Sequence, residues 1–188
     1  NLSRMLEAVK PLCTGPQAGA GWQIRIAAAP AIPRSFYSRM LQRAALPEGC
    51  VELVEGDTYR LLSHATAALV TSGTATLETA LLGVPQVVCY YMRCGWLVSR
   101  IRPYFLKVPF ISLVNLIAGR EVVAELVADG MTADNARRHL LDILPGTPGH
   151  EAMLRGYADM AARLGEPGAP ARAAAEMVAR LHERTQQG

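Results

Sequence analysis

The residues best suited to chemistry lie between positions 71 and 78, where hydroxyl side chains and one carboxylate surround a glycine. The stretch reads Thr-Ser-Gly-Thr-Ala-Thr-Leu-Glu, and Glu78 follows Thr74 by four residues and Ala75 by three. On a helix these three residues share one face, with Glu78 roughly 6 Å along the axis from Thr74. Helix N-termini attract phosphate through free N–H groups, and Gly73 lets a ligand approach the backbone closely. The spacing therefore suits a nucleotide whose diphosphate meets the helix start and whose ribose hydroxyls meet Glu78.

The same stretch has a simpler interpretation as a capped helix without a ligand. Ser72 would then be the N-cap, and Glu78 would lie on a solvated face. Single turns that contain glycine are weak signals of function, so the residues of this stretch leave both interpretations open.

Short apolar runs alternate with helical patterns on either side of this stretch. Strand-like runs cover residues 22–29, 50–54, 65–71 and 86–92, and helical patterns cover residues 2–12, 33–43, 58–64 and 74–82. Such alternation predicts an α/β fold, a Rossmann-like parallel sheet with flanking helices. Ligands of such sheets bind at the carboxyl ends of the strands, where Ser72 and Gly73 lie.

The later part of the chain is predicted to be mostly helical. Residues 113–121 indicate a turn that leads into another helix, and helical patterns follow at about 132–144, 149–164 and 170–184. We therefore expect a nucleotide-sugar-binding domain over residues 1–145 and a C-terminal helical extension over residues 146–188.

Composition narrows the class of protein. The 188 residues are 51% hydrophobic with a net charge of +3, which allows a sizeable core and gives no argument for nucleic acid. The cysteines form no Cys-x-x-Cys pair and have no metal-ligand spacing with the histidines, so we expect no metal and no cofactor. Cys50 and Cys89 are interpreted as buried thiols, which favours a reducing, cytosolic compartment. No run of about 18 apolar residues predicts a transmembrane helix.

Residues 96–110 interleave apolar and basic side chains. Trp96, Phe105 and Phe110 stand among Arg100, Lys107 and other residues of these kinds. This composition suits a membrane interface or an acyl-chain surface. An ordinary amphipathic helix packed on the sheet is the alternative.

Four segments together resemble the C-terminal portion of the lipid-A-disaccharide synthase family, which are GT-B glycosyltransferases. They are VEGDTY at 54–59, SGTATLE at 72–78, GVPQVV at 83–88 with Tyr91-Met92, and FISLVNLIAGRE at 110–121. SGTATLE is shared with several UDP-sugar enzymes, whereas its combination with the last segment is more specific. The resemblance extends over nearly the whole chain, from about residue 1 to residue 179.

The resemblance implies the C-terminal half of a GT-B fold, which holds the UDP of the donor. The implied reaction is an inverting transfer of diacylglucosamine from UDP-2,3-diacylglucosamine to 2,3-diacylglucosamine 1-phosphate (lipid X), which yields the β(1→6)-linked lipid A disaccharide 1-phosphate and UDP. The resemblance also implies that the protein is cytoplasmic and binds peripherally to the cytoplasmic face of the bacterial inner membrane. It leaves open whether the protein is a homodimer. The nucleotide-binding residues carried over by position are Ser72, Gly73, Thr74, Ala75, Glu78, Asn115, Arg120 and Glu121.

The sequence also departs from the family pattern. A Gly-Ser-Arg loop after the first strand of this domain is expected just before Asn1, and the N-terminal domain with the catalytic base is not in this sequence. We therefore assign no catalytic residue, because no pair of groups makes an acid–base set. For Arg120 and Glu121, electrostatics at a helix start is as good an account as ligand contact. Two alternatives remain: another UDP-sugar GT-B enzyme, and a non-catalytic nucleotide-binding or membrane-surface module.

Overall fold

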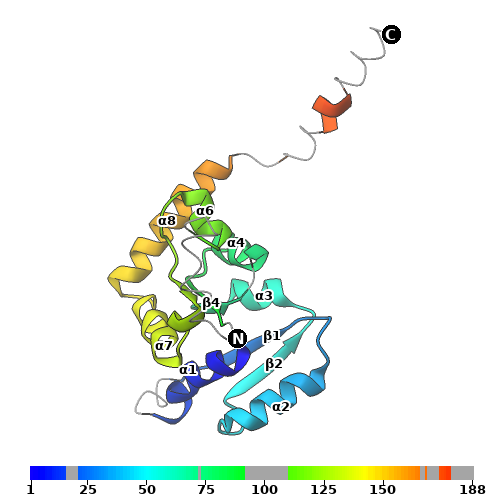
Figure 1. Ribbon diagram of the computed structural model, residues 1–188, viewed down its shortest axis with the longest axis vertical. Helices are drawn as coiled ribbons and strands as arrows, with labels where there is room; N and C mark the ends of the chain where they lie inside the picture. Colours follow the sequence, from blue (N-terminus) through cyan, green and yellow to red (C-terminus); the bar gives the residue numbers. More distant parts are fainter. Residues whose placement is uncertain (16–20, 72, 92–109, 166–167, 169–173, 179–188) are drawn as a thin grey trace.

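The computed structural model describes residues 1–15, 21–71, 73–91, 110–165, 168 and 174–178, and helices and strands alternate along it (Figure 1). The strands are β1 (Ile24–Ala28), β2 (Val51–Glu55), β3 (Ala68–Val70), β4 (Gln86–Tyr90) and β5 (Glu125–Val127). The helices are α1 (Leu2–Thr14), α2 (Arg34–Ala44), α3 (Thr58–Ser63), α4 (Gly73–Leu81), α6 (Leu113–Ala118), α7 (Ala133–Asp142) and α8 (Pro148–Leu164), with a 3-10 turn, η2 (Ala128–Gly130), after β5.

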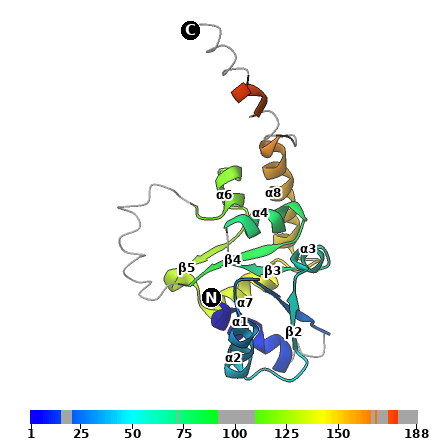
Figure 2. The same cartoon turned by 90° about the vertical axis from the view of Figure 1, so that its right-hand side faces the viewer.

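Every ladder between the described strands is parallel, which confirms the predicted α/β class. β1 pairs with β2 with Ile24 opposite Val51, and β4 lies between β3 and β5 with Val88 opposite Val70 and Glu125. These ladders form two sheets, of order β1-β2 and β3-β4-β5. Figure 2 shows α4 and α6 on one face of the three-stranded sheet and α1 and α7 on the other. This arrangement is consistent with the Rossmann-like half of a GT-B fold.

The core is centred on β4, whose residues Val87, Val88 and Cys89 have no exposed surface. Such a continuous apolar run is typical of a parallel strand covered on both faces. Helices from both ends of the chain pack against it, and α8 contributes Met153 and Met160 to the same cluster. The predicted domain boundary at residue 145 stays a prediction. Helix α8, which follows that boundary, packs into the core of the preceding residues.

The prediction for residues 113–121 was wrong in type. Residues 113–118 are themselves the helix α6, capped at its start by Ser112 and ended by Gly119 in the left-handed conformation, φ 67°. The chain then enters β5 rather than another helix. A strand of three residues has too little pattern to read, and its pairing with β4 is what defines it. Of the helix predicted at 170–184, the structure describes residues 174–178, which are helical.

The interpretation of Cys50 as a thiol was also wrong, whereas that of Cys89 is confirmed. Cys50 is bonded to Cys13 in a disulfide, with their Cα atoms 6.1 Å apart, and Cys89 is free and buried. The two half-cystines are 37 residues apart in sequence, and they meet because α1 packs on α2, bringing the end of α1 beside the start of β2. Disulfides are typical of oxidising surroundings, so the cysteines no longer argue for a reducing compartment.

Candidate functional site

The predicted phosphate-binding turn lies at the carboxyl edge of the three-stranded sheet. β3 ends at Val70, and α4 begins at Gly73, with Thr71 in between and Ser72 outside the described residues. A Cβ atom placed on Gly73 would meet nothing within 4 Å. The backbone at this glycine is therefore uncrowded, and ligand binding there stays a prediction.

Helix α4 has an exposed face and a buried face. Thr74 and Glu78 are exposed and Ala75 is half-buried, and among the described residues the side chains of Thr74 and Glu78 have no hydrogen-bond or ion-pair partner. The other two hydroxyls point inward. Thr76 donates to the Gly73 carbonyl at 2.6 Å and Thr79 to the Ala75 carbonyl at 2.7 Å. The exposed face of α4 thus carries the hydroxyl of Thr74 and the carboxylate of Glu78, as the spacing predicted.

Gln86 fixes this helix against the sheet. Its Nε2 donates to the Thr76 carbonyl at 2.8 Å, and the Tyr157 hydroxyl of α8 donates to the Val84 carbonyl at 3.1 Å. Gly83, φ 72°, ends α4 in the left-handed region and lets the chain turn into β4. Burial raises the pKa of Tyr157 above its usual range, so its hydroxyl remains a donor. These contacts hold the start of β4 and the end of α4 in one position.

Asn115 lies on α6, which packs beside α4, so the structure brings the two predicted segments together (Figure 2). The Asn115 side chain itself is fully buried. Its Oδ1 accepts from the backbone N–H groups of Val122 and Val123 at 2.7 and 3.0 Å. Its Nδ2 donates to the Val123 carbonyl and to Glu125 Oε1, both at 2.9 Å. All four hydrogen-bonding positions of the amide are engaged within the chain.

Glu125 completes this network from β5. Its carboxylate accepts from the backbone N–H groups of Ile111 and Ser112 at 2.8 and 2.9 Å, and from the Ser112 hydroxyl at 2.8 Å. Its negative charge, after the larger effect of burial, also raises the pKa of the neighbouring Tyr90. Ser112, Asn115 and Glu125 therefore fix the backbone of residues 111–125 next to α4.

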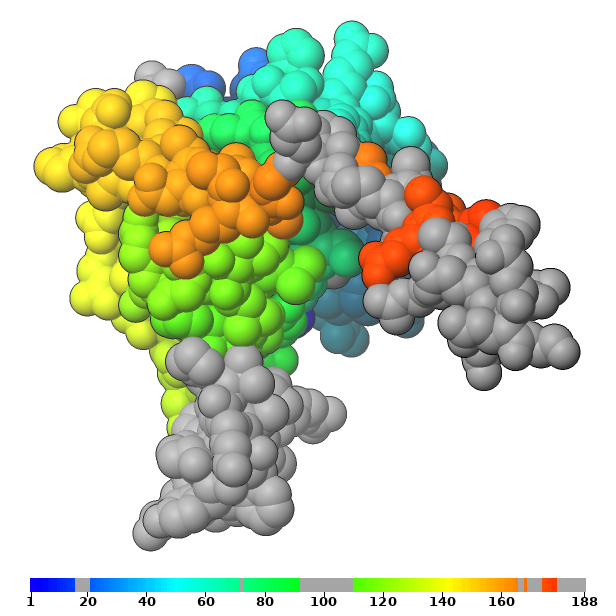
Figure 3. Space-filling view, turned by 90° about the horizontal axis from the view of Figure 1, so that it is seen from above, coloured from blue at the N-terminus to red at the C-terminus, as the bar shows by residue number. Residues whose placement is uncertain are grey.

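Arg120 and Glu121 lie away from this network, on the surface. Arg120 forms an ion pair with Asp159 of α8, with Nη2 to Oδ2 at 2.6 Å, and Glu121 is exposed. Figure 3 shows α8, in orange, lying along the lime-green segment that includes α6. The geometry thus gives Arg120 a structural partner in Asp159, and within the described part of the chain no hydrogen bond or ion pair joins its side chain to α4.

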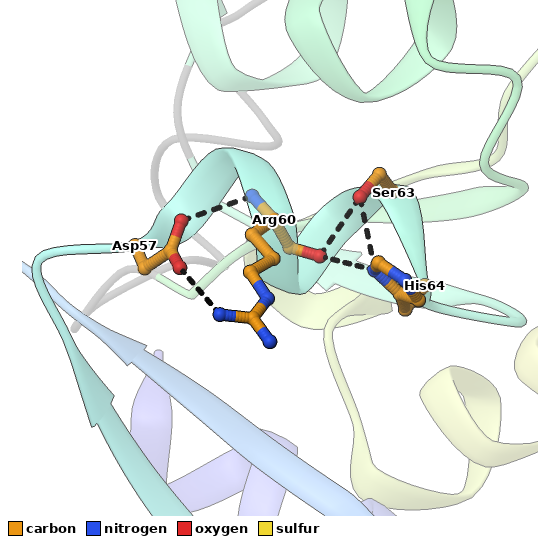
Figure 4. Close-up of polar contacts among 4 residues, drawn as sticks. All are labelled: Asp57, Arg60, Ser63 and His64. Carbon is orange, nitrogen blue, oxygen red and sulfur yellow. Dashed lines mark hydrogen bonds and ion pairs between the residues drawn. The ribbon is translucent and has the colours of Figure 1, made fainter.

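Helix α3 begins at the carboxyl edge of the neighbouring sheet, after β2 (Figure 4). Asp57 caps it by accepting from the Arg60 backbone N–H at 3.3 Å, and its carboxylate lies 3.8 Å from the Arg60 guanidinium. At the other end, the Ser63 hydroxyl donates to the Arg60 carbonyl at 2.9 Å, and His64 Nδ1 lies 2.9 Å from the same oxygen. Both side chains contact the carbonyl of Arg60 in the last turn of the helix. We therefore interpret the contact between Ser63 and His64 as part of the helix end and not as a catalytic pair.

Other expected features fall partly outside what the structure describes. Residues 96–109 of the predicted membrane-facing segment lie outside the described residues. Within the described ranges, no three His, Cys, Asp or Glu side chains are grouped as a metal site. Nor does any helix in that part of the chain have the length and apolar character needed to cross a membrane.

Sequence reasoning missed the residues that position the site rather than line it. Gln86, Ser112 and Glu125 were not singled out, although each makes hydrogen bonds that hold α4 or the segment beside it. Gln86 carried a signal, since it is a polar residue inside the apolar run of β4 and is fully buried. Glu125 carried none, because β5 was not predicted.

Comparison with known proteins identifies the family. The family model described as lipid-A-disaccharide synthetase matches residues 28–153, which include β3, α4 and α6. The chain belongs to the lipid-A-disaccharide synthase family. The match covers all four segments on which the resemblance was based and most of the described core.

Curated members of the lipid-A-disaccharide synthase family support this assignment. The chain is 38% identical to the Myxococcus xanthus protein over 174 residues, 92% of this chain and 43% of that protein. It is 34% identical to the Anaeromyxobacter dehalogenans (strain 2CP-C) protein over 178 residues, 94% of this chain and 44% of that protein. With the Solibacter usitatus protein, 41% identity extends over 126 residues, 66% of this chain and 32% of that protein. The chain thus spans less than half the length of these relatives.

Proposed function

We propose that this chain is the donor-binding half of a lipid-A-disaccharide synthase and holds the UDP of UDP-2,3-diacylglucosamine. The acceptor is 2,3-diacylglucosamine 1-phosphate. In the inverting transfer, the 6-hydroxyl oxygen of the acceptor bonds to C1 of the donor sugar from the face opposite UDP. The bond from C1 to the phosphate oxygen breaks, UDP leaves with the electron pair, and the hydroxyl proton passes to a base.

The exposed face of α4 is the observation that carries the proposal. Gly73 has open space in front of it, and the side chains of Thr74 and Glu78 lie on one exposed face without partners among the described residues. In the proposed complex, the diphosphate meets the backbone of residues 72–75 and the hydroxyl of Thr74. The carboxylate of Glu78 accepts hydrogen bonds from the ribose hydroxyls. Such bonds to a charged acceptor are stronger than hydrogen bonds between neutral groups.

The second segment has a supporting role in this proposal. Since the amide of Asn115 is engaged within the chain, we assign it the shaping of residues 111–125 beside α4, with ligand contact through the backbone of that segment. Arg120 and Glu121 are on the exposed side of the same segment and stay predicted contacts of the nucleotide.

The base and the acceptor surface are assigned to the part of the protein that the relatives have and this chain does not cover. Binding at the cytoplasmic face of the inner membrane is part of the proposal, because the proposed substrates carry acyl chains, and a homodimer stays a prediction. Neither is needed for the donor site on α4.

Titration of UDP into this chain, followed by ligand-observed NMR, tests the proposal. Glu78→Ala should weaken UDP binding by about 10-fold to 150-fold, because a hydrogen bond to a charged group contributes about 1.5–3 kcal/mol. Glu48→Ala is the matched control, since Glu48 is also exposed but precedes β2 at the amino edge of its sheet. ADP serves as the ligand control.

The possible results separate the hypotheses. Binding that is selective for UDP, lost in Glu78→Ala and kept in Glu48→Ala, supports a donor site on α4. Equal affinity of both variants and the unchanged chain for UDP would show that Glu78 is only a surface residue. Equal binding of UDP and ADP would favour a nucleotide-binding module without uridine specificity.

A further inference from the structure

A continuous chain of hydrogen bonds runs from α8 through β4 into the first turn of α4. The Tyr157 hydroxyl of α8 accepts from Gln86 Nε2 at 3.3 Å, and the same Nε2 donates to the Thr76 carbonyl at 2.8 Å. The Thr76 hydroxyl in turn donates to the Gly73 carbonyl at 2.6 Å. These bonds connect a helix from the last third of the sequence with the turn that follows β3.

The neighbours of Gln86 fix the orientation of its amide. A carbonyl can only accept, and the Tyr157 hydroxyl already donates to the Val84 carbonyl at 3.1 Å, so both neighbours require the NH2 group of the amide. Gln86 Oε1 is left without a hydrogen-bond partner among the described residues, although Gln86 has no exposed surface. The glutamine therefore buries an acceptor that nothing in its surroundings satisfies.

Stability alone gives no reason for a glutamine at this position. Residue 86 begins β4, where Val87, Val88 and Cys89 have no exposed surface, and a buried acceptor without a partner destabilises a fold. The Thr76 carbonyl does not depend on Gln86, since within an α-helix it already accepts from the N–H four residues later. A methionine of similar size would leave no acceptor unpaired. What the glutamine adds is a second bond that holds Thr76 in place.

The last bond of the chain acts on the peptide group between Gly73 and Thr74. A peptide group is planar, so a bond that holds the Gly73 carbonyl also fixes the direction of the Thr74 N–H. That N–H belongs to the first turn of α4, where N–H groups have no carbonyl partner within the helix and are free for an anion. Thr76 has no exposed surface and lies on the side of the helix opposite the exposed Thr74. It can thus direct this N–H without touching a ligand.

We propose that Tyr157, Gln86 and Thr76 are positioning residues for the diphosphate of the UDP donor, and that α8 thereby belongs to the donor site. The inference rests on the proposed function, because it requires a diphosphate at the turn around Gly73. Helix α8 packs beside α4, as Figure 2 shows. Since the chain of bonds ends at the backbone that meets the diphosphate, its loss should weaken binding of UDP and leave binding of uridine unchanged.

Two substitutions of Thr76 separate positioning from stability. Thr76→Val keeps the size of the side chain and removes the hydroxyl, whereas Thr76→Ser keeps the hydroxyl and removes a buried methyl group. Ligand-observed NMR gives the affinities for UDP and uridine, and urea denaturation gives the stability of each variant. Thr76→Val should weaken UDP binding by about threefold to tenfold, the effect of one lost hydrogen bond, and change uridine binding by less than about twofold. Thr76→Ser should restore UDP binding although it unfolds at lower urea.

Two buried tyrosines provide a matched test at the other end of the chain. Tyr157 and Tyr37 are each 4% exposed, and the Tyr37 hydroxyl accepts from the Ala29 N–H at 2.8 Å. Because both hydroxyls bond to a backbone group, Tyr157→Phe and Tyr37→Phe should lower the urea midpoint to a similar extent. UDP binding should weaken relative to uridine in Tyr157→Phe and in Gln86→Met, and should be unchanged in Tyr37→Phe.

A measurement without ligand separates this inference from the proposed function. The backbone NMR order parameter of Thr74 should be about 0.85, the value of rigid backbone, in the unchanged chain and in Thr76→Ser. It should fall in Thr76→Val and in Gln86→Met. If this pattern is found in a chain that does not bind UDP, it supports the hold on the Thr74 N–H and refutes the proposed function alone. Equal order parameters in all variants overturn the inference, and so does an equal loss of affinity for UDP and uridine.

Discussion

Replacement of Asn115 by alanine tests whether this residue organises the site or merely lies near it. Alanine removes the two acceptor contacts to the Val122 and Val123 N–H groups and the two donor contacts to the Val123 carbonyl and Glu125. Val122 is half-buried and can turn to water, whereas Val123 has no exposed surface. Its N–H and carbonyl are left unpaired at about 1–3 kcal/mol each. We therefore expect the free energy of unfolding to fall by about 4 kcal/mol, a large part of the stability of an ordinary domain.

Urea denaturation followed by circular dichroism measures this loss, and Leu116→Ala is the matched control. Leu116 is on the same helix but 40% exposed, so its truncation should cost under about 1 kcal/mol. Hydrogen exchange at the Val123 amide under native conditions gives an independent measurement and should speed up only in Asn115→Ala. The reasoning is refuted if the two variants unfold at the same urea concentration and the Val123 amide stays protected.

Four further predictions concern packing and the cysteines. Gly156→Ala should destabilise the protein by about 1–3 kcal/mol, because the new Cβ would lie 2.5 Å from Val122 Cγ1, and adding Val122→Ala should restore the urea midpoint. Reduction of the Cys13–Cys50 disulfide should lower the free energy of unfolding by about 4 kcal/mol for its 37-residue loop; an unchanged urea midpoint with reductant would contradict this. Burial raises the pKa of the Cys89 thiol from 9.0 to about 12, so native protein should resist iodoacetamide at this position at pH 8, as peptide mass spectrometry would show. The thiol ionises near pH 9 in the unfolded state but stays neutral up to about pH 12 in the folded state. The free energy of unfolding should therefore be unaffected by this group below pH 9 and fall between pH 9 and 12, at up to about 1.4 kcal/mol per pH unit. A Cys89→Ala variant should lack that part of the decline.

Local pattern was enough for the elements that contain their own signals. The alternation of apolar runs with helical spacing predicted the parallel α/β class, and α1, α4 and α8 lie within a few residues of their predicted bounds. The exposed face of α4 also follows from spacing, since Thr74 and Glu78 are one helical turn apart and Thr76 and Thr79 fall on the other side.

The misses share a physical cause, which is that long-range contacts leave little local trace. β5 has three residues and exists through its pairing with β4, so no periodicity could reveal it. Cys13 and Cys50 meet because two helices pack together, and a separation of 37 residues gives no hint of this.

The sequence by itself determined the turn after β3 and the exposed face of α4, because both depend on neighbours within four residues. The tertiary structure alone decided what Asn115 does. From sequence alone, an asparagine whose amide is free for a ligand cannot be distinguished from one whose amide is hydrogen-bonded to Val122, Val123 and Glu125. Burial of the amide in the packed core requires those internal bonds, since a buried polar group without a partner destabilises the fold.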